Sequence, residues 1–234
     1  MLRNITFKLK VYLSRHIPIL PVINRFLKAF IISIRKEKEI YSQHGEDKML
    51  WDILKRDFPS DTYFYIDVGA FHPSLLSNTY KFYRRKMNGV VIEPNRELIT
   101  LHRLFRARDI HLEIGCDSKN GLRKFNIQRY TPALSSLDPS ENNNSHSQII
   151  PVFTLDSICN DLNIEYVHLL SIDVEGNDLE VLKGAENTLE KTYLICIESN
   201  SLEFDSLIVE FLKKRNFKMI EKIACNLIFQ KLNQ

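Results

Sequence analysis

From residue 41 onward, short apolar runs alternate with segments in which apolar residues recur at helical spacing. The runs at 62–68 (TYFYIDV), 89–93 (GVVIE), 167–173 (VHLLSID) and 193–198 (YLICIE) are rich in β-branched and aromatic side chains, which is typical of buried strands. The stretches between them are long enough to hold crossover helices. This pattern predicts an α/β fold with a largely parallel sheet covered by helices on both faces.

The remaining segments extend this pattern to both ends of the core. The two closing runs, 217–223 and 226–231, are separated by a short polar break that suits an antiparallel hairpin. We therefore expect a mostly parallel seven-stranded sheet that ends in an antiparallel hairpin. Further expected elements are strands near 111–116 and 122–127 and helices over 77–86, 154–160, 179–189 and 204–215. The stretch 130–147 (YTPALSSLDPSENNNSHS) is rich in Pro, Ser and Asn, which predicts a loop, either a substrate-facing lid or a plain surface segment.

The first 40 residues differ electrostatically from the rest of the chain. Lys and Arg outnumber acids nine to one over residues 1–38, a net charge of +8, which leaves −5 for the remainder of the chain. We divide the chain into a basic amphipathic extension at 1–40 and a single folded domain at 41–234. Charges interrupt the extension too often for a membrane-spanning helix. A peripheral contact with an anionic membrane surface is one expectation, and a helical pair packed on the core or on a second subunit is the other.

Cysteine use and charge limit the compartment and the partners. The four cysteines at 116, 159, 196 and 225 form no C-x-x-C pair and have no histidines at zinc spacing. They predict free thiols in a reducing compartment, so we expect a cytoplasmic protein, with the inner membrane surface as the alternative site if the extension binds lipid. The acidic core and the lack of a recognition motif argue against nucleic acid as a partner.

Polar residues gather where the predicted strands end. Asp67 and Gly69 close the first strand, Glu93 closes the second, Asp173 and Glu175 follow a later one, and Glu198 closes the next. Ligands of open parallel sheets bind beyond the carboxyl ends of the strands. We therefore expect these residues to share one site.

The residues after the first two strands indicate the kind of cofactor. Gly69 would let the backbone approach a ligand closely, and Glu93 is placed to accept hydrogen bonds from two ribose hydroxyls. The residues after Gly69 give G-A-F-H-P-S where a dinucleotide site would have G-x-G-x-x-G. The sequence thus indicates an adenosine-containing cofactor and disfavours a nicotinamide dinucleotide.

An ordered set of motifs resembles the FkbM family of methyltransferases, which use S-adenosylmethionine. The motifs are SQHGED at 42–47, DVGAFHP at 67–73, SNTY at 77–80, GVVIEP at 89–94, TLD at 154–156, SIDVEGNDLEVLKG at 171–184 and CIES at 196–199. They span residues 41–200 and leave the extension outside. The resemblance implies a Rossmann-like methyltransferase fold.

By the same resemblance, several strand-end residues would bind the cofactor. Asp67, Gly69 and Ala70 would contact its methionine part, Glu93 its ribose, and Asp117, after the third strand, the adenine edge. In many relatives Asn-Gly follows DVGA, whereas this chain has Phe71-His72-Pro73. The departure from the family pattern therefore lies beside the residues expected to contact the methionine part of the cofactor.

Methyl transfer to a hydroxyl also needs a base. His72 and His44 are candidates because imidazole titrates near neutrality, although each also fits a structural role. Asp173 and Glu175 are candidates as carboxylates at a strand end, and Glu175 could instead cap the next helix. Asp173 and Glu198 could also hold Mg²⁺, although two ligands make a weak case, and we assign no metal residues.

These observations favour an S-adenosylmethionine-dependent O-methyltransferase acting on a sugar, a glycan or a related metabolite, with the acceptor class taken from the family resemblance. N-methylation stays open. One alternative is a nucleotide-sugar-dependent glycosyltransferase in which Asp173-Val174-Glu175 mimics a metal motif. Another is a non-catalytic, membrane-associated scaffold. The oligomeric state is left open.

Overall fold

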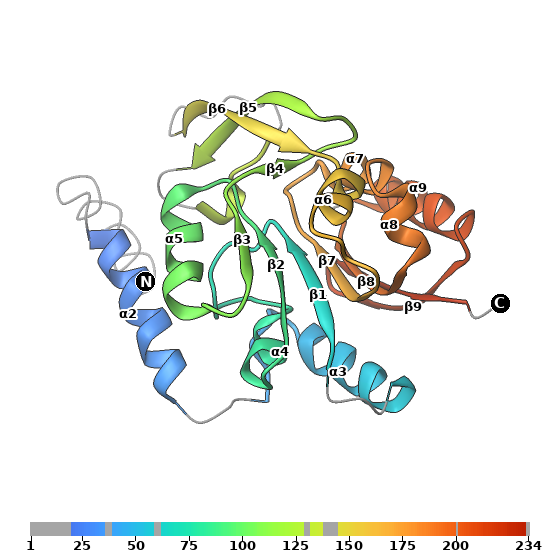
Figure 1. Ribbon diagram of the computed structural model, residues 1–234, viewed down its shortest axis with the longest axis horizontal. Helices are drawn as coiled ribbons and strands as arrows, with labels where there is room; N and C mark the ends of the chain where they lie inside the picture. Colours follow the sequence, from blue (N-terminus) through green and yellow to red (C-terminus); the bar gives the residue numbers. More distant parts are fainter. Residues whose placement is uncertain are drawn as a thin grey trace, which may run out of the picture.

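The computed structural model describes residues 20–35, 39–58, 62–128, 132–137, 145–199 and 201–232. Its centre is a seven-stranded sheet with the order β3-β2-β1-β7-β8-β10-β9 (Figure 1). The strands are β1 (Phe64–Val68), β2 (Asn88–Ile92), β3 (Ile110–Leu112), β7 (Val167–Ile172), β8 (Thr192–Glu198), β9 (Phe217–Ile223) and β10 (Asn226–Lys231). The pairs from β3 to β8 are parallel, and β10 runs antiparallel to both of its neighbours. The predicted α/β fold and its closing hairpin are confirmed.

Helices cover both faces of this sheet because strand side chains alternate between the two faces. Tyr65 of β1 packs with Trp51 and Phe82 on one face, whereas the next residue, Ile66, packs with Leu182 on the other. The first face carries α3 (Glu46–Asp57), α4 (Tyr80–Arg84) and α5 (Arg96–Phe105), and the second carries α6 (Leu155–Asp161), α7 (Asp178–Lys183), α8 (Glu186–Glu190) and α9 (Leu202–Lys213). The result is three layers around one continuous sheet.

The expected helix over 179–189 is two helices, α7 and α8, separated at Gly184 and Ala185. A Cβ at Gly184 would lie 2.4 Å from the carbonyl oxygen of Asp117, so a glycine is required where the chain passes this backbone. The strand expected over 111–116 is also divided. Its first part is β3, and its second part, β4 (Gly115–Cys116), joins a different sheet.

A second, three-stranded sheet has the order β4-β6-β5 and lies above the central sheet in the view of Figure 1. Strand β5 (Gly121–Gln128) pairs antiparallel with β6 (Ser145–Phe153). We expected the first of these strands but not β6, which overlaps the end of the loop assigned to 130–147. Of that loop, the structure describes 132–137, which contains the 3₁₀ helix η1 (Pro132–Leu134), and 145–147, which begin β6. Residues 130–131 and 138–144 lie outside the described residues.

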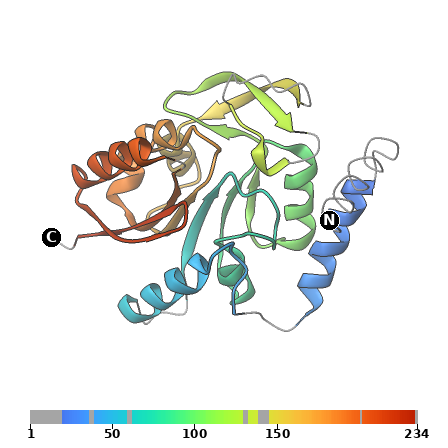
Figure 2. The same ribbon diagram turned by 180° about the vertical axis from the view of Figure 1, so that it is seen from behind.

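Part of the basic extension is helix α2 (Leu20–Ile34), which lies against α5 at the outer edge of the molecule (Figures 1 and 2). The rings of Phe26 and Phe105 meet edge to face at 5.4 Å between centroids, and Arg25 forms an ion pair with Glu97. Residues 1–19 and 36–38 of the extension lie outside the described residues. Within the described part of the chain, no helix is long and apolar enough to cross a bilayer.

Candidate active site

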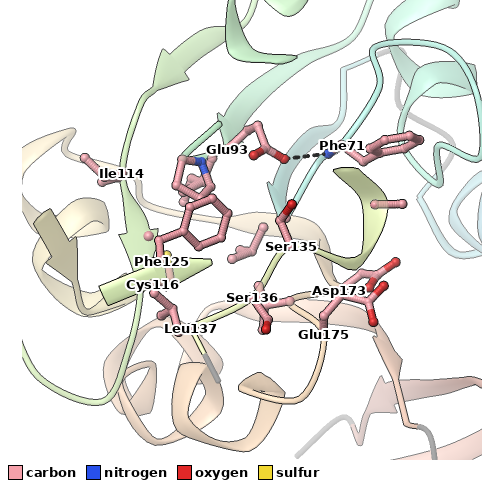
Figure 3. A pocket seen from close by; sticks show the side chains of 17 residues that line it. Phe71, Glu93, Ile114, Cys116, Phe125, Ser135, Ser136, Leu137, Asp173 and Glu175 are labelled. Atoms are coloured by element: carbon pink, nitrogen blue, oxygen red, sulfur yellow. Dashed lines mark hydrogen bonds between the residues drawn. The ribbon is translucent and has the colours of Figure 1, made fainter. Parts of the chain in front are cut away.

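A cleft lies between the two sheets, at the carboxyl ends of β1, β2 and β7 (Figure 3). Four residues selected from the sequence line it, namely Gly69, Glu93, Asp173 and Glu175. The strand ends therefore converge as the sequence pattern predicted.

Gly69 forms the sharp turn after β1. Its φ is +76°, and a Cβ at this position would lie 1.8 Å from the carbonyl oxygen of Asp173. Its N–H donates to the carbonyl oxygen of Ile92 at 2.9 Å. Because only glycine fits here, the turn after β1 packs directly against the backbone that follows β7 and holds the two strand ends close together.

Glu93 is held rigidly at the tip of β2. One carboxylate oxygen accepts the N–H of Phe71 at 3.0 Å, and the other accepts the N–H of Asn95 at 2.7 Å (Figure 3). Each oxygen has a second lone pair available for a ligand hydroxyl. Burial raises the pKa of Glu93 to about 7, against the lowering effect of these two backbone hydrogen bonds.

Asp67, expected to touch the cofactor, lies one layer below the cleft wall. Its carboxylate accepts a hydrogen bond from the hydroxyl of Thr79 and lies 3.6 Å from a guanidinium nitrogen of Arg106. Burial raises the pKa of Asp67, and the charge of Arg106 opposes that rise. Arg106 itself is fully buried and also binds Asp109 at 2.7 Å and the hydroxyl of Tyr65 at 2.9 Å. Through these contacts Asp67 anchors the floor of the site.

Ala70 and Asp117 flank the cleft without forming its wall. The N–H of Ala70 donates to the carbonyl oxygen of Ile92 at 3.3 Å. The Asp117 carboxylate accepts the N–H of Ser118 at 2.7 Å and pairs with Arg123 at 2.9 Å. Cys116, next to Asp117, is part of the wall.

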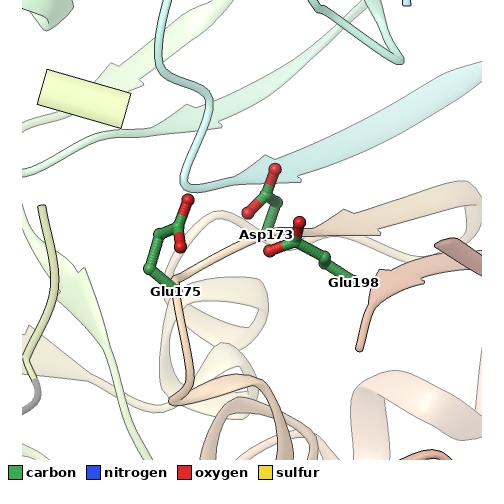
Figure 4. Close-up of side chains that lie close together, drawn as sticks. All are labelled: Asp173, Glu175 and Glu198. Carbon is green, nitrogen blue, oxygen red and sulfur yellow. The ribbon is translucent and has the colours of Figure 1, made fainter. Parts of the chain in front are cut away.

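Three carboxyl groups come together at one end of the cleft. Oxygens of Asp173, Glu175 and Glu198 all lie within 4.8 Å of one another (Figure 4). Enclosure by the surrounding chain raises the pKa of Asp173 well above its usual range, and the charge and hydrogen bond of Glu198 raise it further. The Asp173 side chain is exposed to solvent, so the nearby charge of Glu198 is a cause of the raised pKa that does not depend on burial.

Glu175 owes its position to a strained turn. Its φ is +53°, in the left-handed region that few residues other than glycine adopt. The Asp178 carboxylate holds this turn by accepting the N–H groups of Val174 at 3.2 Å and Gly176 at 3.1 Å. Burial, followed by the charges of Glu198 and Asp178, raises the pKa of Glu175 to about 7. Such strain concentrates at functional sites.

The two histidines are placed differently from the carboxylates. His72 is fully buried; its Nε2 donates to the carbonyl oxygen of Arg25 at 3.2 Å, and its Nδ1 accepts the N–H groups of Ser74 at 3.2 Å and Leu75 at 3.1 Å. Burial lowers its pKa to about 4. This geometry disagrees with the role of base considered for His72, because no ring nitrogen is left for a substrate. His44 lies 3.5 Å from Glu46 at the start of α3.

Other cleft residues were not selected individually from the sequence, although several belong to the 130–147 loop, which was expected to be either a substrate-facing lid or a plain surface segment. They come from the turn after β1, from β5 and from the segments around β4 and η1, and are Phe71, Ile114, Phe125, Ser135, Ser136 and Leu137. The apolar members among them, with Ile92, give a surface on which an adenine ring fits. Together with the Gly69 turn and Glu93, these walls fit S-adenosylmethionine.

The sheet order, the glycine turn after β1 and the acidic tip of β2 define a Rossmann-like methyltransferase. The chain belongs to the methyltransferase FkbM domain family, whose sequence profile matches residues 67–219. The protein is accordingly a methyltransferase, and S-adenosylmethionine is the methyl donor that its family implies. This assignment displaces the glycosyltransferase alternative.

Among solved structures, a Klebsiella pneumoniae protein described as a "putative O-methyltransferase" aligns over 97% of each chain, with 12% identity and a TM-score of 0.44. No curated protein matches the chain.

Proposed function

We propose that the protein transfers the methyl group of S-adenosylmethionine to a hydroxyl of a sugar, a glycan or a related metabolite. The observation that carries the proposal is the meeting of Asp173 and Glu198 at the end of the cleft that also holds Glu93. A hydroxyl acceptor must lose a proton during transfer, and these carboxyl groups are placed to take it.

The proposed role of Asp173 depends on its partner. Two carboxyl groups this close do not both ionise readily, so Glu198 makes the proton of Asp173 harder to remove. Once that proton is lost, Asp173 is a stronger base than an isolated aspartate because its pKa is raised. It accepts the proton of the acceptor hydroxyl while the oxygen forms its bond to the methyl carbon and the carbon–sulfur bond breaks.

Alignment supplies much of the rate for such a displacement. S-adenosylmethionine, when bound, contributes an electrophilic methyl group on a sulfonium. Glu93 would orient the ribose, and the Gly69 turn would let the rest of the cofactor lie against the backbone. Glu175 would accept a hydrogen bond from the acceptor, beside Asp173.

The polarity of the acceptor side supports a polyhydroxylated substrate. The carboxyl groups of Asp173 and Glu175 and the serines Ser135 and Ser136 line the cleft (Figure 3), and Glu198 lies beside the two acids. Such a set matches several hydroxyl donors on one molecule. An amine acceptor would also meet carboxylates here, so N-methylation is the second outcome that an acceptor screen should detect.

The test separates cofactor binding from chemistry. Calorimetric titration with S-adenosylmethionine and S-adenosylhomocysteine would be run on the wild type, Glu93→Gln and, as a matched control, Glu165→Gln, which is exposed just before the amino end of β7. NAD and a UDP-sugar serve as controls for the other cofactor classes. We expect binding of the two methionine-derived ligands alone, weakened only in Glu93→Gln. No binding to a folded wild type would contradict the proposal.

Methyl transfer would then be followed with labelled S-adenosylmethionine against monosaccharide, glycan and amine acceptors. A scaffold would bind cofactor without turnover on any acceptor. A magnesium-dependent enzyme, which the three carboxylates would also allow, would lose activity in EDTA and regain it with Mg²⁺. Our proposal requires turnover on a hydroxyl acceptor that EDTA leaves unchanged.

A further inference from the structure

Helix α2 presents its apolar side outward. Five large apolar side chains recur at helical spacing along its outer face and are between 40% and 68% exposed, namely Ile23, Leu27, Phe30, Ile31 and Ile34. We call these five residues the outer stripe; Phe26, beside it, packs on Phe105 of α5. A helix that only packs on a core buries such a stripe, so the outer stripe needs another explanation.

The opposite side of α2 is fixed to the protein mainly by polar contacts. Arg25 pairs with Glu97 of α5, and its carbonyl oxygen accepts a hydrogen bond from His72. At the end of the helix, Arg84 donates to the carbonyl oxygens of Ser33 at 2.7 Å and Arg35 at 3.0 Å. Ala29 and Ile32 fill the space between these anchors and are buried. The outward direction of the stripe is therefore set by specific contacts at both ends of the helix.

Positive charge accompanies the stripe. Lys28 and Arg35 are exposed on or beside α2, and the helix contains no acidic residue. The preceding residues, 1–19, add four Lys or Arg and no acid. A second copy of this helix, or residues 1–19 folded back on it, would bring like charges onto the stripe. An anionic surface with an apolar interior complements both the charge and the stripe.

We propose that α2 is a membrane-docking helix whose outer stripe enters the headgroup region of an anionic bilayer while Lys28 and Arg35 contact lipid phosphates. The enzyme would then lie on the membrane surface by its α2–α5 edge. This inference does not depend on the acceptor or on the catalytic role of any residue.

Flotation of the full-length protein with lipid vesicles tests the proposal. Vesicles of mixed phosphatidylcholine and phosphatidylglycerol are compared with pure phosphatidylcholine vesicles at low and high salt. We expect binding to the mixed vesicles and its weakening by salt. Phe30→Ser with Ile34→Ser should lower this binding by about tenfold or more. Lys28→Gln should lower it by about fivefold, the value of one charge near the surface.

Leu202→Ser is the matched control, because Leu202 is 82% exposed on α9, away from α2. Its vesicle binding should equal that of the wild type. Light scattering of each variant without lipid reports whether a second copy covers the stripe, and the melting temperature reports whether residues 1–19 do. The proposal is overturned if the wild type does not bind mixed vesicles. It is overturned equally if the serine variant binds as well as the wild type, or if its only change is loss of a dimer or of thermal stability.

Discussion

Asp67 and Asp173 lie near the carboxyl ends of adjacent strands, yet their partners differ in charge. Asp67 meets the buried guanidinium of Arg106 and the hydroxyl of Thr79. Asp173 meets another acid, Glu198. The first arrangement neutralises a buried charge, whereas the second brings like charges together at the edge of an open cleft.

This difference separates residues that hold the fold from residues that act on a ligand. A buried acid beside a buried base needs no further partner, and its removal leaves the base uncompensated. Two acids at a cleft oppose each other until a proton, a cation or a hydroxyl donor intervenes. Position at a strand end is therefore insufficient to assign function, and the partner of each side chain decides its role.

The largest expected effect concerns turnover. Asp173→Asn should lower kcat by about 10²- to 10⁴-fold, the usual contribution of a general base, with unchanged affinity for S-adenosylhomocysteine. Asp67→Asn should change stability more than kcat per folded molecule. Single-turnover assays of both variants, with Asp161→Asn at the far end of α6 as control, measure this contrast. Equal losses of kcat in Asp67→Asn and Asp173→Asn would remove the distinction between the two acids.

The next effect concerns stability. Arg106→Met should lower the free energy of unfolding by about 3–5 kcal/mol, because it leaves Asp67 and Asp109 buried without their cation. Arg103→Met is the control, since Arg103 pairs with Glu113 at the surface and such pairs contribute about 0–1 kcal/mol. Urea denaturation gives both values. Similar losses in the two variants would show that the buried network is no more important than a surface pair.

A smaller effect is expected at the tip of β2. Glu93→Gln should weaken S-adenosylhomocysteine binding by about 10- to 100-fold, the value of hydrogen bonds to a charged group. Binding to the wild type should weaken as the pH falls below about 7, because ribose hydroxyls donate to the ionised carboxylate and the pKa of Glu93 is about 7. Calorimetry across this range should show a flatter pH dependence for the variant. An equally steep dependence would assign the titration to another group.

The smallest expected effect concerns the stability that the protein loses when neighbouring carboxyl groups are ionised. The pKa of Glu175 is about 7 in the folded protein and 4.5 ordinarily, so the folded state holds the proton more tightly and stability falls as the pH rises through this interval. Glu175→Gln should therefore raise the melting temperature at about pH 8 and change it little at about pH 4.5. Thermal unfolding at both pH values, with Glu165→Gln as control, measures this. A gain that is equal at both pH values would point to the strained backbone rather than to charge.

The sequence predicted the convergence of the strand ends because that convergence follows from sheet topology alone. Gly69, Glu93, Asp173 and Glu175 each followed an apolar run, and the structure brings them to one cleft. The pairing of Glu198 with Asp173 follows from the adjacency of β7 and β8, which sequence order only suggests.

Features that depend on distant segments were not predicted. Strand β6 alternates exposed Ile149 with buried Ile150 and Val152, a signal that Pro151 and the preceding polar run obscured. Phe125 reaches the cleft only because the small sheet folds over it, whereas the position of Ser135 agrees with the lid interpretation of the 130–147 loop. The chemistry of His72 suggested a base, whereas its burial and its three main-chain partners are properties of the folded chain.

The bond from His72 to the carbonyl oxygen of Arg25 joins the cofactor turn to the N-terminal helix. Phe71, the neighbour of His72, donates to Glu93, so a single short path connects the surface helix with the carboxylate that we propose binds the ribose. Suppose that a ligand favours the docked position of that helix, and that this position favours an ordered cofactor turn. That ligand then strengthens cofactor binding, and thermodynamic reciprocity requires that the cofactor strengthen binding of the ligand by the same factor. The buried imidazole of His72 would thus couple ligand binding at the N-terminal helix to cofactor binding in the cleft.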